Sequence, residues 1–129
     1  MGNASPGSWN SLLARAAAEV EAVQSELPAD LRPAALAVPV RFESVASEAL
    51  VADGFDPDLL GLFTGDPIGT PSVDLGTFPA EILLFLESLW DFVEADPDLF
   101  VEEVRITYLH ELGHALGLDE DDLDERGLL

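Results

Sequence analysis

The chain has 129 residues, and its 26 acidic against 5 basic side chains give a formal net charge of −21 at pH 7. This length suits a single domain, and a hydrophobic content of 48% is enough for a folded core, which argues against a disordered acidic chain. The strongly negative field disfavours nucleic acid and anionic membrane surfaces as partners, although it attracts cations. We interpret the charge mainly as a source of solubility.

The chain contains no cysteine, so any metal must be bound by histidine, carboxylate or backbone oxygen. The first residues lack the basic and apolar regions of a signal peptide. The longest apolar run, residues 82–86, is far too short to span a bilayer. We therefore expect a cytoplasmic protein that does not bind membranes.

The predicted organisation is a flexible N-terminus over residues 1–10, followed by one domain over residues 11–129. An amphipathic helix should come first, with Ser11 as its N-cap and Pro28 just beyond its end. The apolar residues at helical spacing are Leu12, Leu13, Ala16, Val20, Val23 and Leu27.

After this helix the spacing of apolar residues changes from helical to alternating, which predicts a small sheet. Apolar residues alternate over residues 38–42, which indicates a strand, and Pro39 favours a position at the sheet edge. A short apolar stretch at residues 59–65 precedes a predicted long surface loop at residues 66–79. Residues 81–87 then predict a buried strand, and residues 88–95 a short helix that begins near Ser88.

The best-defined element is a helix that opens after Asp96 and runs to about Leu116. Asp96 suits the N-cap and Pro97 the first helical position, while Gly117 suits the left-handed conformation at the C-terminus. One face of this helix is apolar and should face the core: Val101, Tyr108, Leu112, Ala115 and Leu116. The opposite arc carries Glu103, Thr107, His110 and His114.

His110 and His114 are the only histidines of the chain, and the segment His110–Glu111–x–x–His114 has the HExxH pattern. Positions i and i+4 place two imidazoles one turn apart, where both can bind one zinc ion at about 2.0–2.1 Å. Glu111 lies beside this arc, in a position suited to a general base. The alternative is a chance pair of surface histidines, which the helical context disfavours.

A catalytic zinc site usually has three protein ligands. Because only 15 residues follow His114 (129 − 114), the third ligand is expected in the acidic run after Gly117. The extended pattern HExxHxxGxx(H/D/E) makes Glu120 the first candidate, with Asp119 second and Asp121 third. The other acidic residues are interpreted as a solvated tail or as the first turn of a short last helix.

Three further side chains of this region are assigned outside the site. Arg105 falls toward the apolar side of the helix, and we expect it to pair with a carboxylate of an adjoining element. Tyr108 and Trp90 are expected to pack in the core.

The segment "TYLHELGHALGLDEDDL" and the upstream order "VPVRFES", "DLLGLFTG" and "EILLFLE" resemble the minimal zincins, small single-domain zincin-like metallopeptidases of bacteria. The resemblance implies an α+β fold in which an N-terminal helix and a small sheet accompany the HExxH helix and a short C-terminal helix. It also implies that His110, His114 and the acidic position after Gly117 bind zinc.

The leading hypothesis is therefore a zinc-dependent metallopeptidase that hydrolyses peptide or protein substrates, with Glu111 as the general base. An exposed edge formed by residues 59–65 or by the strand around residues 38–44 would hold an extended peptide. The alternative is a metal-binding or protein-interaction module that keeps the scaffold with little or no turnover. A purely structural metal is less favoured, because closed zinc sites usually have four protein ligands.

Overall fold

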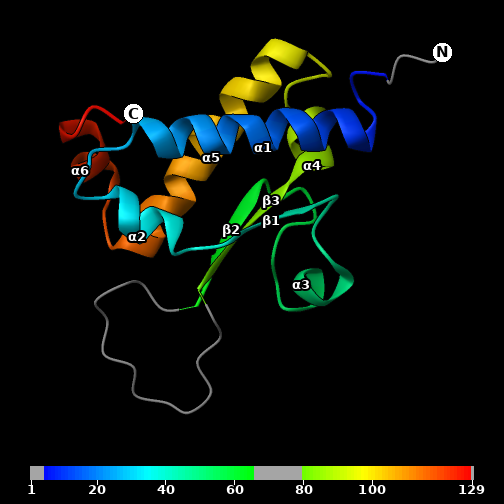
Figure 1. Ribbon diagram of the computed structural model, residues 1–129. Coiled ribbons are helices and arrows are strands. Elements are labelled where there is room, and N and C mark those ends of the chain that lie inside the picture. The colour runs from blue at the N-terminus through cyan, green and yellow to red at the C-terminus, as the bar shows by residue number, and fades with distance from the viewer. Residues whose placement is uncertain (1–4, 66–79, 129) are drawn as a thin grey trace.

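The computed structural model describes residues 5–65 and 80–128, so the predicted loop at residues 66–79 lies outside the described residues. Figure 1 shows a three-stranded sheet beside two long helices, α1 (Trp9–Glu26) and α5 (Pro97–Leu116). Helix α5 packs against both α1 and the sheet. The expected α+β class is thus confirmed. None of the described helices combines the length and hydrophobicity needed to cross a bilayer.

Helix α1 begins three residues earlier than predicted. The side chain of Ser8 accepts a hydrogen bond from the Ser11 backbone N–H at 3.2 Å, so Ser8 is the N-cap. The prediction of Ser11 as the cap was wrong, because the Ser8 side chain caps the helix one turn earlier and Ser11 lies within it. Of the predicted apolar positions, Leu12, Ala16, Val20, Val23 and Leu27 are buried.

The sheet has the order β1-β3-β2. Strand β1 (Val40–Glu43) runs parallel to the central strand β3 (Glu81–Phe85), and β2 (Gly61–Thr64) runs antiparallel to it. The predicted edge position of β1 is confirmed, and the apolar stretch at residues 59–65 supplies the opposite edge.

Strand β3 is buried on both faces, which explains its unbroken apolar sequence. Ile82 and Leu84 face the main core beneath α1 and α5. Leu83 and Phe85 point to the other side, into a smaller cluster with Ala46. That cluster lies on the side of α3 (Glu48–Ala52), whose Leu50 packs against it.

Three short helices depart from the predicted elements. Helix α4 (Leu86–Phe92) follows β3 directly, so the strand ends two residues sooner and the helix begins two residues sooner than expected. It ends before Glu94 and Ala95 because both have positive φ angles, of 54° and 63°. The five-residue helices α2 (Arg32–Leu36) and α3 were not predicted, since each is too short to show a period.

Helix α5 has the predicted ends. The Asp96 side chain accepts hydrogen bonds from the backbone N–H groups of Asp98 and Leu99, and Gly117 has a φ of 73°. The predicted pairing of Arg105 with an adjoining element is confirmed, because its guanidinium lies 2.8 Å from Glu26 on α1.

The buried surface of α5 is wider than the predicted apolar stripe. Phe100, Val104 and Leu109 are also buried, whereas Val101 and Leu116 are only half-buried. Thr107, which was expected opposite the core, is buried at 7% exposure because the sheet covers that side of the helix as well. The helix is therefore enclosed on two sides and open mainly along the arc of the histidines.

The predicted core roles of the two aromatic residues agree with their surroundings. Tyr108 is fully buried, and its hydroxyl accepts a hydrogen bond from Gln24 at 3.1 Å. Trp90 is half-buried and meets Phe100 edge-to-face, with 5.8 Å between the ring centroids.

Candidate metal centre and active site

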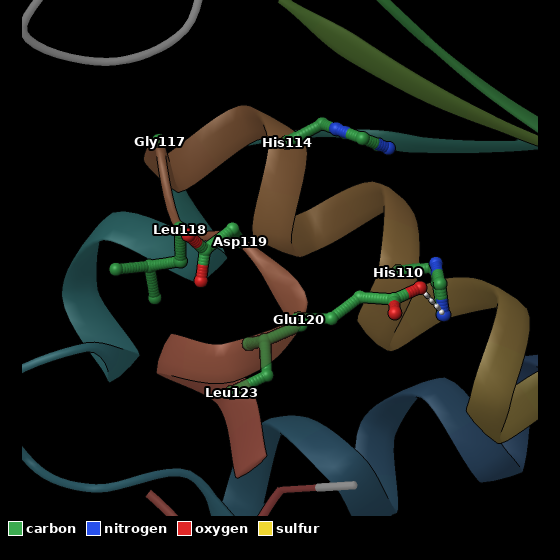
Figure 2. A pocket seen from close by; sticks show the side chains of 7 residues that line it. All are labelled: His110, His114, Gly117, Leu118, Asp119, Glu120 and Leu123. Atoms are coloured by element: carbon green, nitrogen blue, oxygen red, sulfur yellow. Dashed lines mark ion pairs between the residues drawn. The ribbon is translucent and has the colours of Figure 1, made fainter. Parts of the chain in front are cut away.

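His110 and His114 lie on the open arc near the C-terminal end of α5. His114 is exposed and His110 is half-buried. In Figure 2 both imidazoles extend from the helix toward the same side. They line a hollow of about 360 Å³ together with the segment that follows the helix: Gly117, Leu118, Asp119, Glu120 and Leu123.

The chain turns back on itself after α5, and this turn brings Glu120 beside His110. Gly117 adopts the left-handed conformation, and the Leu118 backbone N–H donates to the Gly113 carbonyl at 2.8 Å. Helix α6 (Glu120–Glu125) begins immediately afterwards. Its first side chain, Glu120, places Oε1 3.2 Å from Nε2 of His110 (Figure 2).

A glycine inside the HExxH segment permits this close approach of α6 to α5. A Cβ added at Gly113 would lie only 2.9 Å from Cδ1 of Leu123, the buried residue of α6. A Cβ at position 113 would therefore crowd the contact between α5 and α6, against Leu123 and the Leu118 carbonyl at 3.2 Å.

The other two candidate ligands of the acidic run are placed differently. The Asp119 carboxylate caps α6: it accepts from the Asp122 backbone N–H at 2.8 Å, while Asp122 accepts from the Asp119 backbone N–H. Asp119 points away from His110 in Figure 2. Asp121 is exposed and does not line the hollow. Among the three candidates, Glu120 alone contacts a histidine.

Glu111 lies on the side of α5 that faces β2, between the histidines and the sheet. It is half-buried, and its Cγ lies 3.3 Å from the position that a Cβ on Gly61 would occupy. Burial raises the pKa of the Glu111 carboxyl, whereas the imidazoles of His114 and His110 oppose part of that rise. The backbone of Phe63 on β2 also opposes it.

A groove of about 350 Å³ runs between the start of β2 and α5. Gly61 lines one side of it, and Ile106 and Thr107 line the other. His110 and Glu111 also line the groove, and His110 lines the histidine hollow as well. Leu59, Leu60 and Ile106 give the groove apolar surface, and Ile106 is 45% exposed.

The sequence analysis gave no role at the site to two residues of this groove, Gly61 and Thr107, although it placed Thr107 on the arc of the histidines. An isolated glycine in a strand often marks a close approach by another part of the chain, and that signal was present at Gly61. Thr107 carried no such signal, because only the packing of β2 decides which arc of α5 is covered.

A model of one protein family, described as zincin-like metallopeptidase, matches residues 35–128. The chain belongs to the zincin-like metallopeptidase family. The resemblance inferred from the HExxH helix and its upstream segments is thereby confirmed. No curated protein was found to match the sequence.

Membership of the zincin-like family implies a metal ion, typically zinc, and part of the donor set fits such an ion. Two ligands of a tetrahedral zinc ion at about 2.1 Å lie about 3.4 Å from each other. The separation of 3.2 Å between His110 Nε2 and Glu120 Oε1 suits such a pair. Imidazole and carboxylate are also the donor types that catalytic zinc sites use.

In the part of the chain that the structure describes, the side chains that could bind the metal ion do not form a complete set of three ligands in this conformation. Within residues 5–65 and 80–128, no three His, Cys, Asp or Glu side chains lie together closely enough to hold a metal ion. His114 is exposed, so packing against the rest of the protein does not fix its side-chain rotamer.

Gly61→Ala is expected to destabilise this zincin-like protein by about 1–3 kcal/mol, the usual cost of overpacking. The added Cβ would lie 2.6 Å from Cγ2 of Thr107, which cannot move away because Thr107 is buried. Thr107→Ser removes that methyl group, so the double variant should lose less stability than the sum of the single variants. Urea unfolding of the four proteins measures this difference. Equal costs of Gly61→Ala in both backgrounds would rule out the steric explanation.

The raised pKa of Glu111 predicts a pH-dependent stability in protein stripped of metal. Between the unfolded pKa, about 4.3, and the higher folded pKa, the folded state binds more protons, so the free energy of unfolding falls as pH rises. Glu111→Gln cannot ionise, and the variant should gain stability relative to the parent as the pH rises from about 4 into the neutral range. Denaturant unfolding at a series of pH values measures this gain. A constant difference across that series would contradict the prediction.

Proposed function

We propose that the protein is a zinc-dependent peptidase in which His110, His114 and Glu120 hold the ion and Glu111 acts as the general base. The observation that carries this proposal is the placement of Glu111, a half-buried carboxylate beside both imidazoles that lines the β2–α5 groove. When bound, zinc supplies Lewis acidity, which makes water acidic near neutral pH and polarises a carbonyl.

The chain's own residues supply the remaining requirements of hydrolysis. The substrate peptide would lie extended in the groove, with β2 offering backbone groups along its outer edge. Strand β2 is favoured over β1 for this role, because β2 borders the groove on α5 whereas β1 lies at the opposite edge of the sheet.

Proton movement is assigned to the carboxylate of Glu111. It takes a proton from the attacking water, which adds to the peptide carbonyl carbon, and it then delivers a proton to the departing amide nitrogen. The C–N bond breaks, leaving a carboxylate and an amine. The raised pKa suits this role, because a base with a pKa closer to neutrality also releases its proton as an effective acid.

Removal of the metal provides the direct test. The purified protein should contain about one zinc ion per chain, and cleavage of a mixed peptide library should stop after dialysis against a chelator. Addition of zinc to the dialysed protein should restore cleavage, which controls for irreversible unfolding. Cleavage that continues without metal would disprove the proposal, and bound zinc without cleavage would favour the alternative of a binding module.

A further inference from the structure

A third cavity, of about 390 Å³, lies at the start of β2 where β3 passes into α4. Figure 1 shows α4 directly continuing the central strand. The cavity is lined by residues from two segments: Asp58 and Leu60 before β2, and Ser88, Asp91 and Phe92 on α4. The Phe85 backbone N–H donates to the Leu60 carbonyl at 3.0 Å and so joins the two segments.

This cavity, termed here the α4 pocket, adjoins the β2–α5 groove. Leu60 lines both of them, just as His110 lines both the groove and the histidine hollow. A peptide that occupies the groove beside Glu111 therefore has a side-chain pocket within reach along the same strand edge.

The lining of the α4 pocket combines negative charge with apolar surface. Asp58 and Asp91 are both exposed, and neither forms an ion pair among the residues that the structure describes. Leu60 and Phe92 supply the apolar walls, and Phe92 is 61% exposed. An aliphatic stem that ends in a positive charge matches this combination, because the stem covers apolar surface while the charge meets carboxylates.

A buried hydroxyl independently indicates a polar ligand. Ser88 is only 7% exposed, and within the described part of the chain its hydroxyl makes no hydrogen bond. No fully enclosed side-chain nitrogen or oxygen atom of the described residues lacks a partner, so the Ser88 hydroxyl keeps some exposed surface, and Ser88 lines the pocket. A hydroxyl held in this way can accept a hydrogen bond from an ammonium or guanidinium group.

We propose that the α4 pocket receives an arginine or lysine side chain of the substrate, so that the enzyme acts on basic peptides. This inference rests on the proposed peptidase function. Asp58 and Asp91 bind the charge, Ser88 accepts a hydrogen bond from it, and Leu60 and Phe92 contact the aliphatic stem. The carboxylate of Glu103, which lines the neighbouring groove, adds to the same preference.

Binding of matched peptides tests the proposal without turnover. The Glu111→Gln background keeps peptides intact, and the probes are acetyl-Ala-Ala-Arg-Ala-Ala-amide and the same peptide with citrulline, which is nearly isosteric but uncharged. The arginine peptide should bind about tenfold more tightly, as expected for a charge-assisted hydrogen bond. Titrations followed by NMR should shift the backbone resonances of Leu60 and Ser88.

Asp58→Asn and Asp91→Asn should each remove most of this preference. Glu21→Gln is the matched control, because Glu21 is exposed on α1 and its loss changes the net charge equally. Equal binding of the two peptides, no binding of the arginine peptide, or an equal effect of the control would overturn the proposal. The proposed peptidase function fails separately, if cleavage is insensitive to chelator or survives in Glu111→Gln.

Discussion

Glu111→Gln is expected to lower the rate of peptide hydrolysis by about a hundredfold to ten-thousandfold, the usual contribution of a general base. Glutamine keeps the size of the side chain but cannot accept the proton of the attacking water. His110, His114 and Glu120 are unchanged, so the zinc content should stay the same. Initial rates on a peptide from the library, together with metal analysis of both proteins, measure the two expectations.

Glu102→Gln is the matched control for this variant. Glu102 is exposed on the same helix and does not line the β2–α5 groove, so its loss changes the charge of α5 without touching the candidate site. The control should retain the parental rate. Full activity in Glu111→Gln would exclude Glu111 as the base, whereas an equal loss in both variants would point to a general effect of charge.

Glu120→Ala is expected to weaken zinc binding by more than about a hundredfold, because even residues that only support metal ligands contribute ten- to a hundredfold. The Glu120 Oε1 atom lies 3.2 Å from Nε2 of His110, where both can bind one ion. The Glu120 side chain is 73% exposed. The variant should stay folded, since most of the Glu120 side chain is exposed to solvent. Competition with a chromogenic chelator measures the affinity.

Two neighbouring variants separate Glu120 from the other acidic candidates. Asp121→Ala should bind zinc as the parent does, because Asp121 does not line the histidine hollow. Asp119→Asn should also retain zinc, since asparagine can still cap α6. If either variant loses zinc while Glu120→Ala retains it, the assignment of the third ligand is wrong.

The negative charge of the chain includes two carboxylates at the α4 pocket, those of Asp58 and Asp91, which are open to a ligand. A net charge of −21 indicates solubility and a general attraction for cations. Four of the five arginines meet carboxylates or backbone carbonyls of the chain itself: Arg32, Arg41, Arg105 and Arg126. Asp58 and Asp91 have no such partner among the described residues, so the surplus charge at this pocket is open to a ligand.

Much of the site helix was predictable because its signals are local. Asp96, Pro97 and Gly117 mark the ends of α5 through backbone hydrogen bonding and the left-handed conformation, which depend on neighbouring residues alone. The i, i+4 spacing likewise placed His110 and His114 on one arc. The family match confirms the resemblance to zincin-like metallopeptidases that was based partly on this motif.

The short elements were less predictable. Helix α4 begins at Leu86 inside the apolar run, where periodicity cannot distinguish the end of a buried strand from the start of a buried helix. The N-cap of α1 was misplaced for a related reason: Ser8 and Ser11 are equally suitable caps, and the choice depends on where the chain enters the domain.

The sequence by itself determined the class of protein, the helix that carries the two histidines and the acidic run that follows them, because composition, spacing and capping act over a few residues. Only the tertiary structure decided which acidic residue meets His110 and which strand borders the site. Gly113 allows α6 to pack close to α5, and Gly61 allows β2 to cover Thr107 and approach Glu111. Both features depend on contacts between segments far apart in the chain. The need for glycine at positions 61 and 113 is therefore visible only when the residues that pack against them are known.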